Sequence, residues 1–383
     1  MVKIKLGDVI DFKNGKSVKK SDGIIPIYGG NGILGYTDKS NFSHTIVVGR
    51  VGAYCGSIHV EDNSCWVSDN AIAGVPKEGQ DLTYLYYVLK SLNLNSKQIG
   101  SSQPLITQSM LKDMVVDIEI DIEKQKKIAN SISIIDQKIQ INNQINQELE
   151  AMAKTLYDYW FVQFDFPDQN GKPYRSSGGK MVYNPELKRE IPEGWGVAKL
   201  NEVVDLISGY PFSSNDYVIS GKYKLYTIKN VQDGYTVDKV DNYLDFLPSN
   251  MSHECQLRRG DLIMSLTGNV GRVGMVYEDD VLLNQRVLKL NPINKTHKSF
   301  IYSFFRSDVT KAHLENMSTG TSQKNLSPID IGNMMIPFPS ESLLSKFLDN
   351  LNMLENNLVE NQQLTKLRDW LLPMLMNGQA KVE

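Results

Sequence analysis

Residues 123–161 of this 383-residue chain read EKQKKIANSISIIDQKIQINNQINQELEAMAKTLYDYWF, and this stretch decides the fold. Counted in sevens, one position of each heptad holds Ile128, Ile135, Asn142, Leu149 and Leu156, and a second holds Ile132, Ile139, Asn146, Ala153 and Trp160. Two such positions per heptad are typical of a helix that packs along another helix, and Asn residues within the seam specify its register. The stretch therefore predicts one long helix that needs a partner.

The C-terminal part of the chain supplies that partner. The series Ile128, Ile132, Ile135, Ile139 and Asn142 returns 219 residues later as Phe347, Leu351, Leu354, Leu358 and Asn361. The first helix leads into the second half of the chain and the other follows that half, so the two must run antiparallel for their seams to meet. We interpret them as one helix pair, and two unrelated amphipathic helices remain the alternative.

Four shorter motifs also occur twice and in the same order, which indicates an internal duplication. Residues 5–12 match 199–206, Gly49-Arg50-Val51-Gly52 matches the glycine loop that ends at Gly271, 85–91 match 301–307, and 100–107 match 320–327. Runs of β-branched residues predict strands at 24–28, 45–48, 223–228 and 262–265, and 82–92 and 299–306 have helical patterns. We expect an α+β chain with a globule at 1–121, a long helix at 122–163, a linker without strands at 164–198, a second globule at 199–339 and a second long helix at 340–378.

The composition limits the class of protein. Hydrophobic residues make up 41% and charged residues 22%, the net charge is −3, and the pI is about 6.0. Three scattered cysteines without a CxxC pair, the lack of HxxxH spacing and the lack of a long apolar run predict a reduced, cytoplasmic protein without a metal site or membrane span. Because the whole chain has no excess positive charge, any contact with DNA must use a local patch or be shared with partner subunits.

These motifs together resemble a known family, the DNA-specificity (S) subunits of type I restriction-modification systems. The resemblance rests on KLGDVIDFKNG at 5–15, the segment 28–36, the loop 49–52, the linker motifs GKPYRSSGGKMV and IPEGW, and LLPMLMNGQ near the C-terminus. It implies two target-recognition domains separated by the helix pair, each reading one half of a split DNA sequence. It further implies a non-catalytic chain that assembles on double-stranded DNA with two methyltransferase (M) subunits and restriction/translocase (R) subunits. S-adenosylmethionine, ATP and Mg are then expected on the partner subunits.

Residues with suitable donors and acceptors are the candidates for DNA contacts. The glycine loops contribute Arg50, Asn269 and Arg272, although tight turn geometry is the other explanation for their glycines. Gln103 and Gln323 recur in both globules, which suits a scaffold or phosphate contact better than base reading. Segments that differ between the globules suit base reading, although lysine-rich stretches are more often simply solvated. The whole candidate set is Lys19, Lys20, Tyr28, Asn31, Arg50, Tyr54, Gln103, Lys224, Lys229, Asn230, Asn269, Arg272, Gln323 and Lys324. The outer faces at Asn143-Gln144 and Gln362-Gln363 are candidate docking sites for M subunits, or are simply solvated.

Several catalytic readings fit poorly. Residues 30–35 spell GxGxxG but no helical pattern follows them, so a dinucleotide site is not expected. Pro167-Asp168 with Glu186-Leu187-Lys188 has the spacing of a nuclease carboxylate set, but it lies in the linker, and Asn184-Pro185-Glu186 does not complete a methyltransferase motif. A duplicated coiled-coil adaptor that binds only proteins remains the alternative from another functional class.

Overall fold

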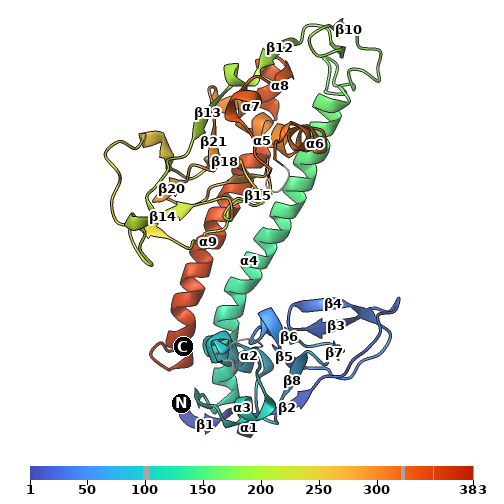
Figure 1. Cartoon of the computed structure of the whole chain (residues 1–383). Helices are drawn as coiled ribbons and strands as arrows, with labels where there is room; N and C mark the ends of the chain where they lie inside the picture. The colour runs from blue at the N-terminus through green and yellow to red at the C-terminus, as the bar shows by residue number, and fades with distance from the viewer. Residues whose placement is uncertain (98–103, 321–323, 348, 383) are drawn as a thin grey trace. The chain divides into compact units, whose positions relative to one another are not determined.

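The computed structural model describes residues 1–97, 104–320, 324–347 and 349–382 and contains both helices and sheets (Figure 1). The chain divides into two compact units. Unit 1 comprises residues 1–140 and 362–383, and unit 2 comprises residues 141–361. Helices α4 (Ile122–Tyr157) and α9 (Asp349–Met376) each contribute to both units. The expected mixture of helices and strands is confirmed.

Unit 1 is built around an antiparallel sheet of order β2-β8-β5-β6. Every residue of β5 is buried in this sheet, which explains why the continuous β-branched run TIVV forms a strand. A second sheet, β4-β3-β7, carries the β3–β4 hairpin, which extends away from α4 (Figure 1). The elements of unit 1 before α4 are β1 (Val2–Lys5), α1 (Leu6–Val9), β2 (Ile10–Asn14), β3 (Ile25–Gly29), β4 (Gly32–Thr37), β5 (Thr45–Gly49), β6 (Ile58–Glu61), β7 (Trp66–Val67), β8 (Ala71–Pro76), α2 (Leu82–Ser91), α3 (Gln108–Asp113) and β9 (Val115–Ile118).

Unit 2 repeats this plan with additions. Its larger sheet has the order β13-β21-β18-β19-β15, and its second sheet has the order β16-β14-β20-β17. The strands are β12 (Gly196–Lys199), β13 (Val204–Ser208), β14 (Tyr223–Tyr226), β15 (Gly234–Tyr235), β16 (Tyr243–Leu244), β17 (Gln256–Leu257), β18 (Leu262–Ser265), β19 (Val273–Met275), β20 (Val281–Leu283), β21 (Val287–Pro292) and β22 (Met335–Phe338). The helices are α5 (Lys298–Arg306), α6 (Asp308–Met317), α7 (Pro328–Gly332) and α8 (Glu341–Lys346).

The strand registers reveal the duplication directly. In unit 1, β3 pairs antiparallel with β4 and parallel with β7, and in unit 2, β14 pairs antiparallel with β16 and parallel with β20. The first strand of each plan pairs with the last, β1 with β9 and β12 with β22. A mixed sheet with the same order of partners in both halves is a specific topology, so the repeat seen in the sequence is a repeat of the fold.

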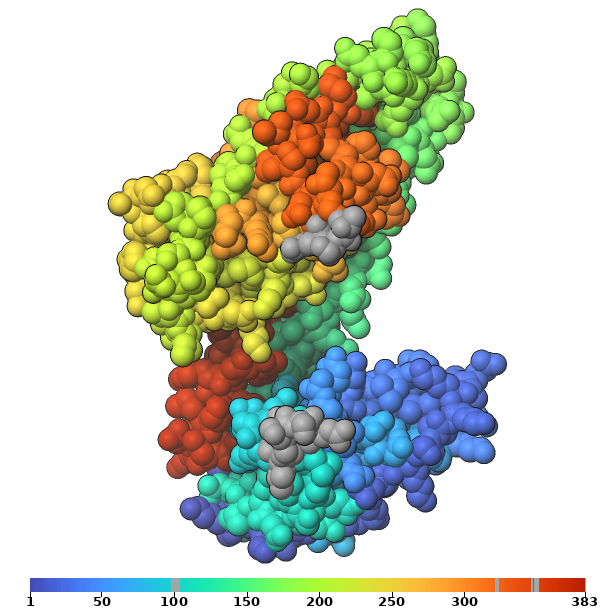
Figure 2. All heavy atoms as spheres, in the orientation of Figure 1, coloured from blue at the N-terminus to red at the C-terminus, as the bar shows by residue number. Residues whose placement is uncertain are grey.

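The segment between α4 and unit 2's sheets is an ordered lobe on the surface of unit 2 (Figure 2). It contains the antiparallel hairpin β10 (Met181–Asn184) and β11 (Arg189–Pro192), so the expectation of a linker without strands was wrong. The buried Asp165 carboxylate holds the lobe by accepting hydrogen bonds from the Ser176 backbone and hydroxyl. Phe166 stacks on both Tyr174 and Trp195, at centroid distances of 4.7 and 5.3 Å. A buried carboxylate and an aromatic stack thus order a segment whose composition indicated a linker.

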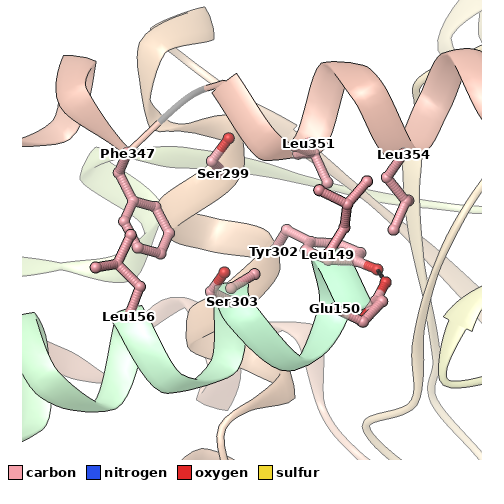
Figure 3. A pocket seen from close by; sticks show the side chains of 10 residues that line it. Leu149, Glu150, Leu156, Ser299, Tyr302, Ser303, Phe347, Leu351 and Leu354 are labelled. Carbon is pink, nitrogen blue, oxygen red and sulfur yellow. Dashed lines mark hydrogen bonds between the residues drawn. The ribbon is translucent and has the colours of Figure 1, made fainter. Parts of the chain in front are cut away.

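The two long helices pack along the predicted seam within each unit. In unit 1, Ile128 and Ile132 of α4 share a core with Leu372, Leu375 and Met376 of α9. In unit 2, Leu149 of α4 shares a core with Leu351 and Leu354 of α9, and these side chains point into one space between the helices (Figure 3). Ile135 is buried, whereas Ile139 and Leu358 are partly exposed.

Asn side chains of the seam meet their own duplicates. Asn142 is fully buried, and its Nδ2 donates to Asn361 Oδ1 at 2.9 Å and to Glu360 Oε2 at 2.7 Å. One turn further along α4, Asn146 Oδ1 accepts from Asn357 Nδ2 at 2.9 Å, one turn back along α9. This opposite stepping means that the helices are antiparallel, as the order of the chain predicts.

The second long helix differs from the expected 340–378. It is divided into α8, which ends at Lys346, and α9, which begins at Asp349. Phe347 follows α8 and packs its ring against Tyr157, the last residue of α4, and against Trp160 and Phe161. The last two belong to the π-helical turn Asp158–Val162 that follows α4. The apolar seam of unit 2 therefore closes on a cluster of aromatic rings.

Candidate nucleic-acid interface

In unit 1, a glycine-rich turn and a glycine-rich loop pack against each other. The loop of residues 49–57, called loop 49–57 below, connects β5 to β6. Ser57 Oγ donates to the Gly30 carbonyl, which His59 Nε2 also contacts at 3.2 Å. A Cβ on Gly49 would lie 2.3 Å from the Tyr54 carbonyl oxygen, so only glycine fits there. At this position, close packing within the loop explains the glycine without a DNA contact.

This packing gathers several candidates at one edge of unit 1. Asn31 in the hairpin turn is exposed, Arg50 is half-buried, and Tyr54 is 52% exposed. Lys19 and Lys20 are exposed, and the Lys20 side chain lies against Gly35 of β4. Within the described residues, neither lysine forms an ion pair with a carboxylate. The hairpin turn and loop 49–57 thus present amide, aromatic and guanidinium groups near one another, and Lys20 adds a cation beside β4.

Tyr28 requires a correction, because its side chain is buried and its hydroxyl donates to Glu61 Oε2 at 3.1 Å. Burial, together with the Glu61 charge, raises the pKa of Tyr28, so the hydroxyl stays a neutral donor held inside the protein. Its role is to tie β3 to β6, and it is not available to read a base.

In unit 2, the corresponding loop lines an open hollow. The loop of residues 266–272, called loop 266–272 below, joins β18 to β19. One wall of the hollow is this loop, and the other is the turn of residues 232–235, called turn 232–235 below. The side chains that line it are Gln232, Asp233, Tyr235, Asn269, Val270, Arg272, Lys311, Glu315 and Lys324. Three candidates, Asn269, Arg272 and Lys324, are therefore brought together, and Arg272 Nη1 donates to Gln232 Oε1 at 3.3 Å.

The other candidates of unit 2 do not join this hollow. Asn230 is 3% exposed, and its side chain accepts from Thr227 and donates to the carbonyls of Val237 and Lys239. The prediction of Asn230 as a base reader was wrong, because the amide is used up in holding its own loop. Lys224 pairs with the buried Glu278 at 2.6 Å and has a structural role, so it too is corrected.

Lys229 pairs with Asp241 at 2.6 Å on an exposed surface, where an ion pair stabilises little and opens readily. Its side chain remains accessible to a phosphate. Gln103 and Gln323 lie outside the described residues, so their role remains the prediction made from the sequence.

Hydrogen bonds of the two loops correct the alignment of the repeat. The Gly52 N–H donates to the Pro104 carbonyl at 3.3 Å, and the Gly268 N–H donates to the Lys324 carbonyl at 3.2 Å. These glycines have matching φ angles of 75° and 74°. Gly52 therefore corresponds to Gly268, whereas the spacing of the letters had paired it with Gly271. Asn269 then corresponds to Ala53, and Arg50 corresponds to the buried Leu266.

Two groups that line the hollow were missed by sequence reasoning. Tyr235 is 49% exposed, and Lys311 on α6 donates to Asp233 Oδ2 at 2.8 Å. Tyr235 follows a glycine in a short polar run, which marks a turn but does not show which side chain faces solvent. Lys311 comes from a helix with no counterpart motif in the first half, so the repeat offered no signal for it.

Across the described ranges, no three His, Cys, Asp or Glu side chains come together as metal ligands. No helix in the same part of the chain has the length and hydrophobicity needed to cross a membrane. Asp168, one of the residues with nuclease-like spacing, caps a turn by accepting from the Asn170 and Lys172 backbones.

Comparison with known proteins gives consistent relatives. The MjaIX type I restriction enzyme specificity subunit of Methanocaldococcus jannaschii is 28% identical over 322 residues, covering 81% of this chain and 71% of that protein. The HindI specificity subunit of Haemophilus influenzae is 24% identical over 330 residues, covering 72% and 71%.

The fold has a solved counterpart in a type I restriction-modification S subunit from M. genitalium, with a TM-score of 0.59 and 20% identity over 98% of this chain and 96% of that chain. The model of one family matches residues 1–151 and 192–367, which include both glycine loops and most of both long helices. The chain belongs to the type I restriction modification DNA specificity domain family.

Proposed function

We propose that this chain is the DNA-specificity subunit of a type I restriction-modification complex. Unit 1 contains the first target-recognition domain (1–121) and unit 2 the second (199–339), and each reads one half of a two-part DNA sequence. The paired helices α4 and α9 act as a spacer that sets the number of unread base pairs between the halves.

The observation that carries this proposal is a loop that occurs in both units with matching glycine conformations and backbone hydrogen bonds but with different side chains. Loop 49–57 presents Arg50 and Tyr54, whereas loop 266–272 presents Asn269 and Arg272, and the positive-φ glycines and cross-loop hydrogen bonds are the same. An arginine can donate two hydrogen bonds to guanine, and an asparagine can form two with adenine. Different side chains on similar loops are therefore suited to reading different bases. The backbone conformation that the two loops share is suited to what both units must do, which is to approach the DNA duplex closely.

The partners follow from the family rather than from this chain's own groups. The relatives named above are specificity subunits of type I restriction enzymes, so we propose that this chain assembles with two methyltransferase subunits and with restriction/translocase subunits. The exposed Asn143 and Gln144 on α4 and Gln363 on α9 are proposed docking positions for the methyltransferases. Gln362, the fourth residue expected on these outer faces, is buried, so that expectation was wrong for Gln362. This chain is proposed to be non-catalytic, with S-adenosylmethionine, ATP and Mg bound by the partners.

Methylation mapping tests the proposal. Modified adenines are mapped by long-read sequencing in a host that expresses the complete system, with and without this chain. The expected result is a motif of two specified halves around an unspecified spacer, present only when the chain is expressed. The assembled complex is then expected to protect that motif in a footprint. A complex that assembles but neither methylates nor binds DNA selectively would support the protein-binding adaptor instead.

A further inference from the structure

A buried arginine in unit 2 connects one wall of the hollow to the long helix α4. Arg306, the last residue of α5, donates from Nε to Asp233 Oδ1 at 3.1 Å and from Nη1 to the Tyr302 hydroxyl at 2.7 Å. It also forms an ion pair with Glu150 of α4. One guanidinium thus holds three groups that come from a helix of the seam, a helix of the globule and turn 232–235.

The backbone of turn 232–235 rests directly on this cluster. The Tyr302 hydroxyl contacts the Gly234 carbonyl at 3.1 Å and also the Glu150 carboxylate, and Figure 3 shows Glu150 and Tyr302 pointing toward each other. Gly234 has a φ of 100°, and a Cβ there would lie 3.1 Å from both Arg306 Nη2 and Glu150 Oε1. The turn therefore has the conformation and the space of a glycine because the ion pair lies beneath it.

Turn 232–235 also contacts loop 266–272 on the other side of the hollow. Gln232 accepts from Arg272 at 3.3 Å, and β15, which contains Gly234 and Tyr235, pairs with β19 at the edge of the larger sheet. Lys311 holds Asp233 from the solvent side at 2.8 Å. A change in the position of the turn would therefore change both walls of the hollow.

We propose that turn 232–235 is a specificity-determining element for the second half of the DNA target, with Tyr235 facing the bases and Arg306 as its positioning residue. This inference rests on the proposed function. Gln232 donates from Nε2 to the Lys229 carbonyl at 3.1 Å and accepts from Arg272, so its amide holds Arg272 at the hollow. Tyr235 supplies an exposed ring beside it, on which a base can stack. Arg306 acts through the turn: it fixes the turn to Glu150, so the wall has one position relative to α4.

The chemistry of Arg306 fits a positioning role better than a DNA contact. Its side chain is 18% exposed, and its charge is shared between Glu150 and Asp233. Burial lowers the pKa of Arg306 to about 10, which still leaves the guanidinium charged at neutral pH between its two carboxylate partners. Unit 1 has a contrasting arrangement, in which the α4 carboxylate of Asp136 binds Tyr87, Lys90 and Arg368 and contacts no residue of loop 49–57 within the described part of the chain.

The test compares methylation maps of complete systems that carry Arg306→Lys, Tyr235→Ala or Asp136→Asn. A lysine keeps the charge but cannot hold three groups with one planar fork, so Arg306→Lys is expected to loosen the turn. Both Arg306→Lys and Tyr235→Ala should raise methylation of sites mismatched in one half of the motif about tenfold, with the other half unchanged. Asp136→Asn is the matched control, and it should relax neither half.

The outcomes separate this inference from the proposed function. If the wild-type system writes no two-part motif, both are overturned. If it writes one, and Arg306→Lys and Tyr235→Ala leave both halves intact, this inference alone is overturned. Equal relaxation of both halves would also overturn it, because general loosening of the fold would then explain the effect. Tyr235→Ala changes an exposed side chain, so this variant remains informative even if Arg306→Lys fails to assemble.

Discussion

Shortening both long helices by one heptad should shorten the spacer of the recognised DNA site. The suitable deletion removes residues 137–143 of α4 together with 360–366 of α9. It keeps the Asp136–Arg368 ion pair of unit 1 and the Asn146–Asn357 hydrogen bond of unit 2, and it removes no residue of either unit's main apolar core. Seven residues correspond to about 10 Å of helix, which is about three base pairs at roughly 3.4 Å each.

Helical phase predicts how tightly the shortened site is bound. Removing seven residues turns a helix by only about 20°, whereas three base pairs turn DNA by about a third of a turn. The duplex must therefore twist to present both halves, and we expect weaker binding to the shortened site than wild-type binding to its own site. A deletion in α4 alone is the control. It moves Asn146 away from Asn357, so it should destabilise the seam and yield no motif.

Methylation mapping of the double deletion decides the matter. A two-part motif with the same halves and a shorter spacer supports the reasoning. The same motif with an unchanged spacer, written by a folded variant, would refute the idea that the helix pair sets the distance. The stability of the variant is measured by thermal unfolding, so that loss of the motif through unfolding is recognised.

Three further predictions concern single sites. Asn142→Leu leaves the Asn361 amide oxygen without its buried donor, so it should lower the free energy of unfolding, measured in urea, by about 1–3 kcal/mol. Adding Asn361→Leu removes the unpaired acceptor and should recover most of that loss. Equal stability of the single and double variants would contradict this coupling. Burial disfavours the charged form of Asp136, but the hydrogen bond from Arg368 and the charge of Lys90 outweigh this effect and hold the pKa of Asp136 below 3.8. The ionised carboxylate therefore stabilises the folded protein above pH 3.8, and this stabilisation is lost as the pH falls further. Unfolding of Asp136→Asn should therefore depend less on pH below about 5, and parallel curves would count against it. Gly49→Ala places a Cβ 2.3 Å from the Tyr54 carbonyl oxygen, so it should lower the free energy of unfolding by about 1–3 kcal/mol and relax one half of the DNA motif. An unaltered methylation map and an unaltered melting temperature would disprove the packing argument.

The helix seam was predictable because its signal is local and repeated. A heptad pattern needs only residues close in the sequence. The recurrence of Asn142 as Asn361, 219 residues later, marks the same seam position in both helices. The same holds for strands such as β5 and β18, whose apolar runs end at turn residues. The seam's division between α8 and α9 was not predictable, since Phe347 fits the apolar pattern whether or not the helix continues through it.

The loops were harder to predict than the helices, because the residue types alone do not show which backbone groups of a loop bond to each other. Loop 266–272 is shorter than loop 49–57, and matching one glycine pair to another shifted the alignment until the backbone hydrogen bonds corrected it. Asn230 looked like a free amide, although Asn in a turn commonly bonds its own backbone. The Arg306 cluster had no signal, because it joins residues from three segments that are distant in the sequence.

The Asn142–Asn361 bond has an implication for the origin of the chain. In a two-fold symmetric dimer, a residue on the axis meets its own copy, because the same patch is used by both subunits. Here one chain contains both copies, and the duplicated asparagines still bind each other. The simplest ancestor is a gene of half this length whose product paired with itself, and fusion of two copies then freed each globule to acquire its own loops.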